Sequence, residues 1–232
     1  MDYTTAAYEI DDDLMLILLN AVMFDAEWQS VYYTNNVRDG EFTDISGTVQ
    51  NVDFMHSTEG RYLDDGMVTG FIKPYSGGAY SFAALLPNEG VSIEDYIGSL
   101  TGGGFLETIG SAQRATVIAS MPKFEYEYEI KMNDALIALG IPDAFNDIKA
   151  DFTKMGTSKD GNLFISLVLH KTFISVDELG TKAGAVTMVA AVPASAPNPE
   201  EQKVVRLDRP FVYAIIDNAT NLPIFIGTLM TV

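Results

Sequence analysis

The sequence predicts an α+β, β-rich fold in which mixed β-sheets are accompanied by a few short helices. Three observations support this prediction. Apolar residues fall in short runs or alternate with polar residues, as in strands. Turn signals rich in Gly, Asn and Asp separate these runs, and helix-start signals are few. With 232 residues, 47% hydrophobic content and no break in composition, the chain can bury a sizeable core, and we expect one domain over residues 1–232.

The first predicted strand spans residues 14–24, an apolar run that only Asn20 interrupts. Such a run suits a strand buried on both faces, so the Asn20 amide needs a partner. Residues 27–54 alternate between polar and apolar, with turn signals at 38–40 and 46–47, and predict antiparallel strands. Further strands are expected at residues 67–73, 80–86, 116–121, 124–131, 162–176, 211–216 and 224–229, the first two joined as a hairpin by Ser76-Gly77-Gly78.

Two short helical regions are predicted. Ser92 to Asp95 has the spacing of a capping box and opens a helix that the glycine run 102–104 stops, with a further helical turn at 105–109. A second short helix extends from Asn133-Asp134, which can cap it, to Leu139, with Gly140 as its stop signal.

The stretch from Gly161 to Ser195 is an apolar strand, an acidic hinge and then a long tract of small residues. The tract is poor in the Ser, Gln and Lys that keep linkers solvated, and it has the composition of a strand without a sheet. Every second residue falls on one face that carries neither charge nor bulk: Thr181, Ala183, Ala185, Thr187, Val189 and Ala191. That face could slide under other strands without a clash.

The charge excludes several classes of function. Fourteen Lys and Arg against 32 Asp and Glu give a formal charge of −18, which repels phosphate backbones and anionic lipid, so we expect neither a nucleic acid nor a membrane partner. Cys is absent, which excludes disulfides, zinc thiolates and a cysteine nucleophile. No signal peptide is expected at the start of this chain, and no segment reaches the ~20 apolar residues of a membrane span.

An enzyme is not expected. Of the two histidines, His56 and His170, the second lies in an apolar strand, where a satisfied core histidine is favoured over a base or a ligand. Ser120 and Lys123 match a Ser-x-x-Lys pattern, but Pro122 blocks the helix that this pattern requires. Neither the acidic runs nor the glycine run has the spacing of a metal or phosphate site, so no cofactor and no metal are expected.

The segment His170 to Thr181, HKTFISVDELGT, resembles the fifth main-sheet strand of the serpin family as it enters the hinge of the reactive loop. Further matches follow in the family's order, at residues 18–28, 121–124, 139–145 and 209–227. The chain therefore resembles a serpin, a serine protease inhibitor, of a bacterial type. The resemblance begins partway through the family, so we expect the N-terminal helical part to be missing and the chain to be the C-terminal two-thirds of a serpin domain.

The resemblance implies a suicide-substrate inhibitor. A target serine protease attacks the reactive-centre loop, which with its hinge spans residues 178–208, and the cut loop inserts into the main sheet; insertion of this kind is an established example of strand addition. The family's usual loop length puts the scissile bond at Ala194-Ser195, after Val192-Pro193. A small apolar residue before the bond suits an elastase- or subtilisin-like protease and excludes a trypsin-like one.

The hinge implied by the resemblance comprises Glu178, Gly180, Thr181, Ala183, Gly184, Ala185 and Thr187. Its inward face carries only small, uncharged residues, which favours an inhibitory member because a charge buried there without a partner would cost several kcal/mol. Lys182 departs from a usual Glu but should face solvent. The alternative is a non-inhibitory serpin-like binding or scaffold domain whose loop is cleaved without trapping a protease.

The resemblance also assigns residues that control sheet opening. Asn20 and His170 match the amide and imidazole beneath the opening sheet, which would satisfy the Asn20 amide. Lys123 and Glu178 match a pair at the top of the sheet, with Trp28 packed near them. The resemblance further implies a secreted or cell-surface protein. Exposed sheet edges would permit self-association.

Overall fold

The computed structural model describes residues 14–181 and 202–232, which group into two compact units. The larger unit consists of Phe24–Glu125 and Ile174–Val232, and the smaller one of Met1–Met23 and Tyr126–Phe173. Within the described residues, no helix is long and apolar enough to cross a bilayer.

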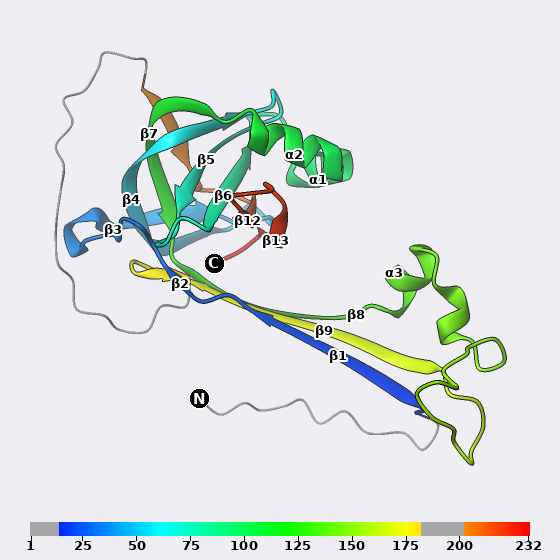
Figure 1. Ribbon diagram of the computed structural model, residues 1–232. Coiled ribbons are helices and arrows are strands. Elements are labelled where there is room, and N and C mark those ends of the chain that lie inside the picture. The colour runs from blue at the N-terminus through cyan, green and yellow to red at the C-terminus, as the bar shows by residue number, and fades with distance from the viewer. Residues whose placement is uncertain (1–13, 182–201) are drawn as a thin grey trace. The chain divides into compact units, whose positions relative to one another are not determined.

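The larger unit is built on an eight-stranded sheet with the order β11-β7-β4-β5-β6-β12-β13, in which β3 also pairs with β4 (Figure 1). Its strands are β3 (Val37–Thr43), β4 (Val49–Asp64), β5 (Val68–Pro74), β6 (Tyr80–Pro87), β7 (Gln113–Pro122), β11 (Lys203–Arg206), β12 (Phe211–Asp217) and β13 (Pro223–Leu229). All neighbours are antiparallel except β11 and β7, which are parallel. The mixed, β-rich fold class predicted from the sequence is therefore confirmed.

The core of the larger unit lies where β5, β6 and β12 meet α1 (Ile93–Ser99) and α2 (Gly102–Gly110), which lie side by side next to the sheet (Figure 1). The side chains in this core are almost all aliphatic or aromatic, and their removal from water is the main stabilising term. The predicted hairpin between β5 and β6 is also confirmed, with Gly77 and Gly78 at positive φ in its turn.

Two turn and cap predictions in the larger unit hold, and two do not. Ser92 caps α1 by accepting a hydrogen bond from the Asp95 amide at 3.0 Å. The prediction that the glycine run stops a helix is wrong, because α1 already ends at Ser99 and the glycines form the first turn of α2. Thr101 caps α2 by accepting a hydrogen bond from the Gly104 amide. Residues 46–47 form the turn between β3 and β4, but residues 38–40 lie inside β3, where the Phe54 ring leaves room only for Gly40.

The smaller unit contains β1 (Leu16–Met23), which pairs in parallel with β9 (Ile165–Val176); β8 (Phe124–Lys131) also pairs with β9. The prediction that β1 is buried on both faces is wrong, since six of its eight residues are exposed, namely Ile17 to Ala21 and Met23. The side chain of Leu19 is 73% exposed. Within the described residues β9 is the only strand that pairs with β1.

The helix α3 (Asn133–Ala138) and the short 3-10 helix η2 (Pro142–Phe145) follow β8. The prediction that Asn133 caps α3 is wrong, because its side chain binds β9 instead. The Asn133 amide donates to the Ser166 carbonyl at 2.9 Å and accepts from the Val168 amide at 2.8 Å. Gly140 lies just beyond the helix at a φ of 103°, as its predicted role as a stop signal requires.

Candidate functional site

The predicted hinge begins at Glu178. The carbonyl oxygens of Asp177, Glu178 and Leu179, at the entry to the hinge, all accept hydrogen bonds from one short segment, residues 28–32. The Trp28 indole N–H donates to the Asp177 carbonyl at 2.9 Å. The backbone amide of Tyr32 donates to Glu178 at 2.9 Å, and the backbone amide of Trp28 donates to Leu179 at 2.8 Å. The two donor residues thus hold the backbone of the hinge at three consecutive positions; we call this arrangement the carbonyl clamp.

A tight turn closes the hinge on the C-terminal side of the clamp. The Asp177 carboxylate accepts from the amides of Leu179 and Gly180 at 2.8 and 3.1 Å, and the Asp177 amide donates to the Gly180 carbonyl at 3.0 Å. The turn reverses the chain, so that Thr181 pairs antiparallel with Val176 of β9. At position 181 the chain therefore runs antiparallel to β9.

Residues 180 and 181 form the short strand β10 (Gly180–Thr181), which pairs antiparallel with β2 (Ala26–Glu27). A side chain at position 180 would overlap the Ala26 carbonyl, so this close approach requires Gly180. Thr181 is fully buried, and its hydroxyl lies 2.6 Å from that of Tyr75. Burial raises the pKa of Tyr75, so its phenol stays protonated and can share this hydrogen bond.

Trp28 lies close to the hinge, where the resemblance placed it, and is 2% exposed. Its ring stacks on Tyr75, with centroids 4.5 Å apart and planes 10° apart, and meets the edge of Phe82 at 5.8 Å. Because its ring is packed and its indole N–H is bonded to Asp177, Trp28 has little freedom to move independently of the hinge.

Lys123 and Glu178 are in contact, with 2.5 Å between the ammonium nitrogen and the carboxylate. Sequence reasoning missed a third member, Asp53, whose carboxylate lies 3.0 Å from the same nitrogen and whose carbonyl accepts from the Lys123 amide. Burial acts to lower the pKa of Lys123, but hydrogen bonds to Glu178 and Asp53 and their negative charges outweigh it, and the pKa is raised. The ammonium is thus charged at neutral pH.

Asn20 and His170 lie directly opposite each other in the β1–β9 ladder, and the Asn20 amide nitrogen is 3.2 Å from His170 Nδ1. An amide nitrogen can only donate, so Nδ1 accepts and a neutral His170 carries its proton on Nε2. The expectation of a core histidine is wrong in degree, since His170 is half-buried and Asn20 is exposed. The cause is the uncovered face of β1.

The remaining predicted site residues lie outside the described residues: Ala183, Gly184, Ala185, Thr187, Val192, Pro193, Ala194 and Ser195. Their roles stay predictions. Among residues 14–181 and 202–232, no group of three or more His, Asp or Glu is arranged to hold a metal ion.

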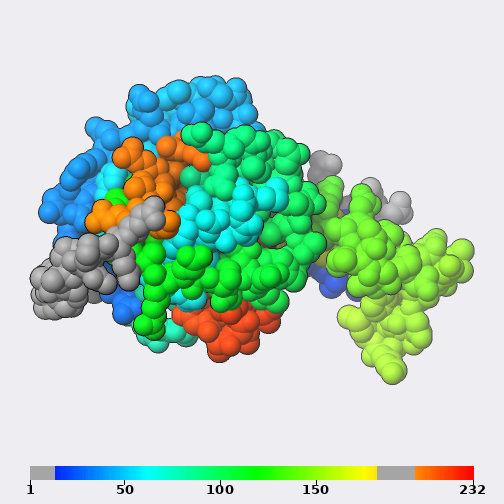
Figure 2. Space-filling view, turned by 90° about the horizontal axis from the view of Figure 1, so that it is seen from above, coloured from blue at the N-terminus to red at the C-terminus, as the bar shows by residue number. Residues whose placement is uncertain are grey.

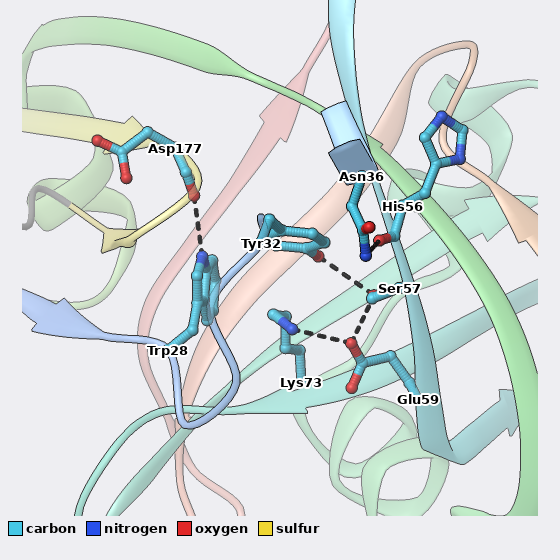
Figure 3. A network of polar contacts seen from close by, with 8 residues as sticks. All are labelled: Trp28, Tyr32, Asn36, His56, Ser57, Glu59, Lys73 and Asp177. Carbon is cyan, nitrogen blue, oxygen red and sulfur yellow. Dashed lines mark hydrogen bonds and ion pairs between the residues drawn. The ribbon is translucent and has the colours of Figure 1, made fainter. Parts of the chain in front are cut away.

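A buried polar network beside Trp28 was missed entirely by sequence reasoning (Figure 3). Its centre is an ion pair between Lys73 of β5 and Glu59 of β4, with 3.0 Å between the charged atoms and both residues buried. The Ser57 hydroxyl donates to the same Glu59 oxygen at 2.6 Å and lies 3.4 Å from the Tyr32 hydroxyl. The only available signal was the alternation of Ser57 and Glu59 along one strand, which also fits a solvated face.

The chain is similar to known proteins of one family. A family model described as "Serpin (serine protease inhibitor)" matches residues 3–232. An uncharacterized serpin-like protein of Thermococcus kodakarensis is 34% identical over 216 residues, which are 93% of this chain and 49% of that protein.

Two solved structures of tengpin, a thermophilic serpin, are also similar. The native-state structure is 53% identical with a TM-score of 0.89, over 97% of this chain and 58% of tengpin. The latent-state structure is 50% identical with a TM-score of 0.74, over 89% and 54%. The chain thus spans about half the length of the relatives it matches.

Replacing Lys123 by Met should lower the free energy of unfolding by about 1 kcal/mol, because two half-exposed carboxylates lose their shared cation in a well-solvated place. The same substitution at Lys149, which is 67% exposed and 3.7 Å from Asp143, is the matched control and should change almost nothing. Urea denaturation at low and high salt measures both, and the Lys123 effect should shrink in salt.

The pH dependence of this difference has a definite sign. A raised lysine pKa gives stability that is complete below the ordinary value of about 10.4 and is lost as pH rises through the raised value. The difference between the native chain and Lys123→Met should therefore hold from about pH 6 to 9 and decline above about pH 10.5. Equal stabilities of the two Lys→Met variants would contradict the role of the contact.

Proposed function

The chain belongs to the serpin family, and on this premise we propose that it acts as a suicide-substrate inhibitor of serine proteases. A protease would cleave the loop that follows the hinge, and the cut loop would insert into the main sheet before the acyl-enzyme is hydrolysed. The chain spans 49% of the Thermococcus kodakarensis protein and 58% of tengpin. The activity of a whole serpin is therefore a proposal for this chain.

One observation carries the proposal: the turn at Asp177–Gly180 already directs the chain antiparallel to β9, through the pairing of Thr181 with Val176. Extending this register two residues at a time would place Ala183 opposite Ile174 and Ala185 opposite Thr172. Directly opposed residues in an antiparallel pair face the same side of a sheet.

Val176 and Ile174 are both buried, at 1% exposure each. The residues that would enter on their side of the sheet are thus Ala183, Ala185 and Thr187, the small and uncharged set. The large or charged residues Lys182 and Val186 would face the other side. The register and the composition of the hinge therefore support the same insertion, although they are independent observations.

Insertion beside β9 requires β1 and β9 to part, and the contacts between them suit a separable pair. They are joined by a parallel ladder and by the Asn20–His170 hydrogen bond, which is solvent-accessible. A strand entering between them would offer hydrogen-bonding partners to both exposed ladders. We propose that Asn20 and His170 control this opening and that Lys123, Glu178 and Trp28 control its start at the hinge.

The proposed scissile bond is Ala194-Ser195, and the proposed target is an elastase- or subtilisin-like protease, whose primary pocket takes a small apolar residue. The resemblance further supports a secreted or cell-surface location, which fractionation of the producing cells and their medium would test. Recovery of the chain only from the cell interior would rule this location out.

A second candidate is a binding or scaffold domain that presents the loop without trapping a protease. The carbonyl clamp favours it, because a hinge held by three hydrogen bonds to its carbonyl oxygens also suits a loop that stays in place. The two candidates differ in whether a bulky charge on the inserting face has any effect.

Incubation with an elastase-like protease should give a complex stable in detergent, and mass spectrometry should locate cleavage at Ala194-Ser195. Ala185→Arg should be cleaved without forming the complex, because insertion would bury an unpaired charge. Val186→Arg is the matched control one residue away on the other face and should still trap. Cleaved loop with fully active protease in the native chain would support the scaffold candidate, and equal trapping by both variants would refute the insertion register.

We also propose that the chain self-associates through β1. Leu18, Leu19 and Met23 are 44%, 73% and 58% exposed on a strand that pairs only with β9 in the described part of the chain. An apolar strand edge of this kind is a template for pairing with a second copy.

Light scattering over a range of concentrations should show association that Leu19→Lys reduces, because a charge on an edge strand opposes strand pairing. Ile148 is 85% exposed but lies outside any strand, so Ile148→Lys is the matched control and should associate like the native chain. A native chain that stays monomeric throughout would exclude this association.

A further inference from the structure

The buried ion pair between Lys73 and Glu59 requires an explanation, because burying two charges costs desolvation energy that their attraction often fails to recover. Lys73 is 2% exposed and Glu59 7%. The pair is therefore weak evidence for stability by itself. What surrounds the ammonium group suggests a different role.

The Lys73 ammonium lies over two aromatic rings in addition to its contact with Glu59. Its nitrogen is 4.3 Å from the ring centroid of Tyr32 and 5.4 Å from that of Trp28. Both distances are within the range of cation–π attraction, which is strongest where water is excluded. One buried cation thus attracts two rings that meet edge to face at 6.5 Å.

The anionic side of the network reaches Tyr32 a second time. Glu59 accepts from Ser57, whose hydroxyl lies next to that of Tyr32 (Figure 3). Burial, followed by the charge of Glu59, raises the pKa of Tyr32, so its phenol stays protonated beside the Ser57 hydroxyl. Tyr32 is therefore held at its ring by Lys73 and at its hydroxyl by Ser57 and Glu59.

Trp28 and Tyr32 are also the two residues that form the carbonyl clamp on Asp177, Glu178 and Leu179. The side chains that the ion pair attracts and the donors that hold the hinge thus belong to the same two residues. The segment that carries both is further tied to β5, because the Gln29 amide donates to the carbonyl of Pro74, the residue after Lys73.

We propose that the Lys73–Glu59 ion pair is a positioning element for the hinge: it fixes Trp28 and Tyr32 and thereby sets how firmly the carbonyl clamp holds residues 177–179. The consequence for inhibition rests on the proposed function, since a weaker clamp would let a cleaved loop insert sooner. The holding of the hinge itself does not depend on that function and can be measured without a protease.

The double variant Lys73→Met/Glu59→Gln removes both charges together and keeps similar side-chain volumes, so neither charge is left buried and unpaired. The backbone amides of Trp28 and Tyr32 report on the clamp, because they donate to Leu179 and Glu178. Their hydrogen exchange should accelerate about tenfold, the scale of one or two buried cation–π contacts. The fluorescence of Trp28, the single tryptophan of the chain, should change with it.

Two controls separate positioning from general stability. Amides of the β5–β6 ladder, in which Ile72 is the register partner of Ala83, should keep their exchange rates, whereas a purely structural effect would change them together with those of the clamp. Lys149→Met/Asp143→Asn removes an exposed pair in the same way and should alter neither exchange nor fluorescence.

Unchanged exchange at Trp28 and Tyr32 in the folded double variant would overturn the inference. Should that variant fail to fold, Ser57→Ala keeps the ion pair and removes only the hydroxyl that links Glu59 to Tyr32. This variant should accelerate hydrogen exchange of the Tyr32 amide more than that of the Trp28 amide. Exchange rates equal to those of the native chain would again overturn the inference. If the native chain traps no protease, the proposed function is refuted, but the inference that the ion pair positions the hinge is unaffected.

Discussion

Three consecutive carbonyl oxygens, those of Asp177, Glu178 and Leu179, are held by donors from Trp28 and Tyr32, and the arrangement of the hinge depends on this clamp. It fixes where β9 ends and where the Asp177 turn reverses the chain. That turn sets the antiparallel pairing of Thr181 with Val176 of β9. Without the clamp, these carbonyls would need other partners, because buried backbone groups are almost always hydrogen-bonded.

The hydrogen bonds between β1 and β9 determine whether a third strand can enter the sheet. When two paired strands part to admit a third, one ladder is lost and two are formed, so the hydrogen-bond balance favours the inserted state. In the proposed mechanism, the position of the hinge and the covalent continuity of the loop would restrain the chain before cleavage. The Lys123 contacts contribute modestly because they are half-exposed, whereas the buried network beside Trp28 acts in a dry environment where charge interactions are stronger.

Figure 2 shows that β11 (orange), the strand on the C-terminal side of the predicted loop, lies at the surface of the larger unit, where it pairs with β7.

Sequence patterns predicted most strands correctly, since alternation and turn residues act locally. The β5–β6 hairpin around Gly77-Gly78 is a clear case. The resemblance to a family brought Asn20 to His170 and Lys123 to Glu178, pairs that lie 150 and 55 positions apart and that no local pattern could join.

The failures concern what packs on what. The apolar run of β1 has the composition of a buried strand, yet its exposure depends on partners that its own sequence does not specify. Asn133 has the chemistry of a helix cap, but a strand carbonyl and amide from residues 166 and 168 compete for it. Glu59 and Lys73 look like ordinary solvated charges, because only the pairing of β4 with β5 and the aromatic residues 28 and 32 make them a buried pair.

In the proposed mechanism, the chain after the hinge runs back along β9, and the cut loop inserts between β1 and β9. Val22 and Thr172 are register partners in these strands, and the chain has no other cysteines, so Val22→Cys/Thr172→Cys permits a disulfide that locks the two strands together. Loop cleavage should raise Tm in the reduced form and leave Tm unchanged in the oxidised form. An equal rise in both forms, or no rise in either, would contradict insertion between these two strands.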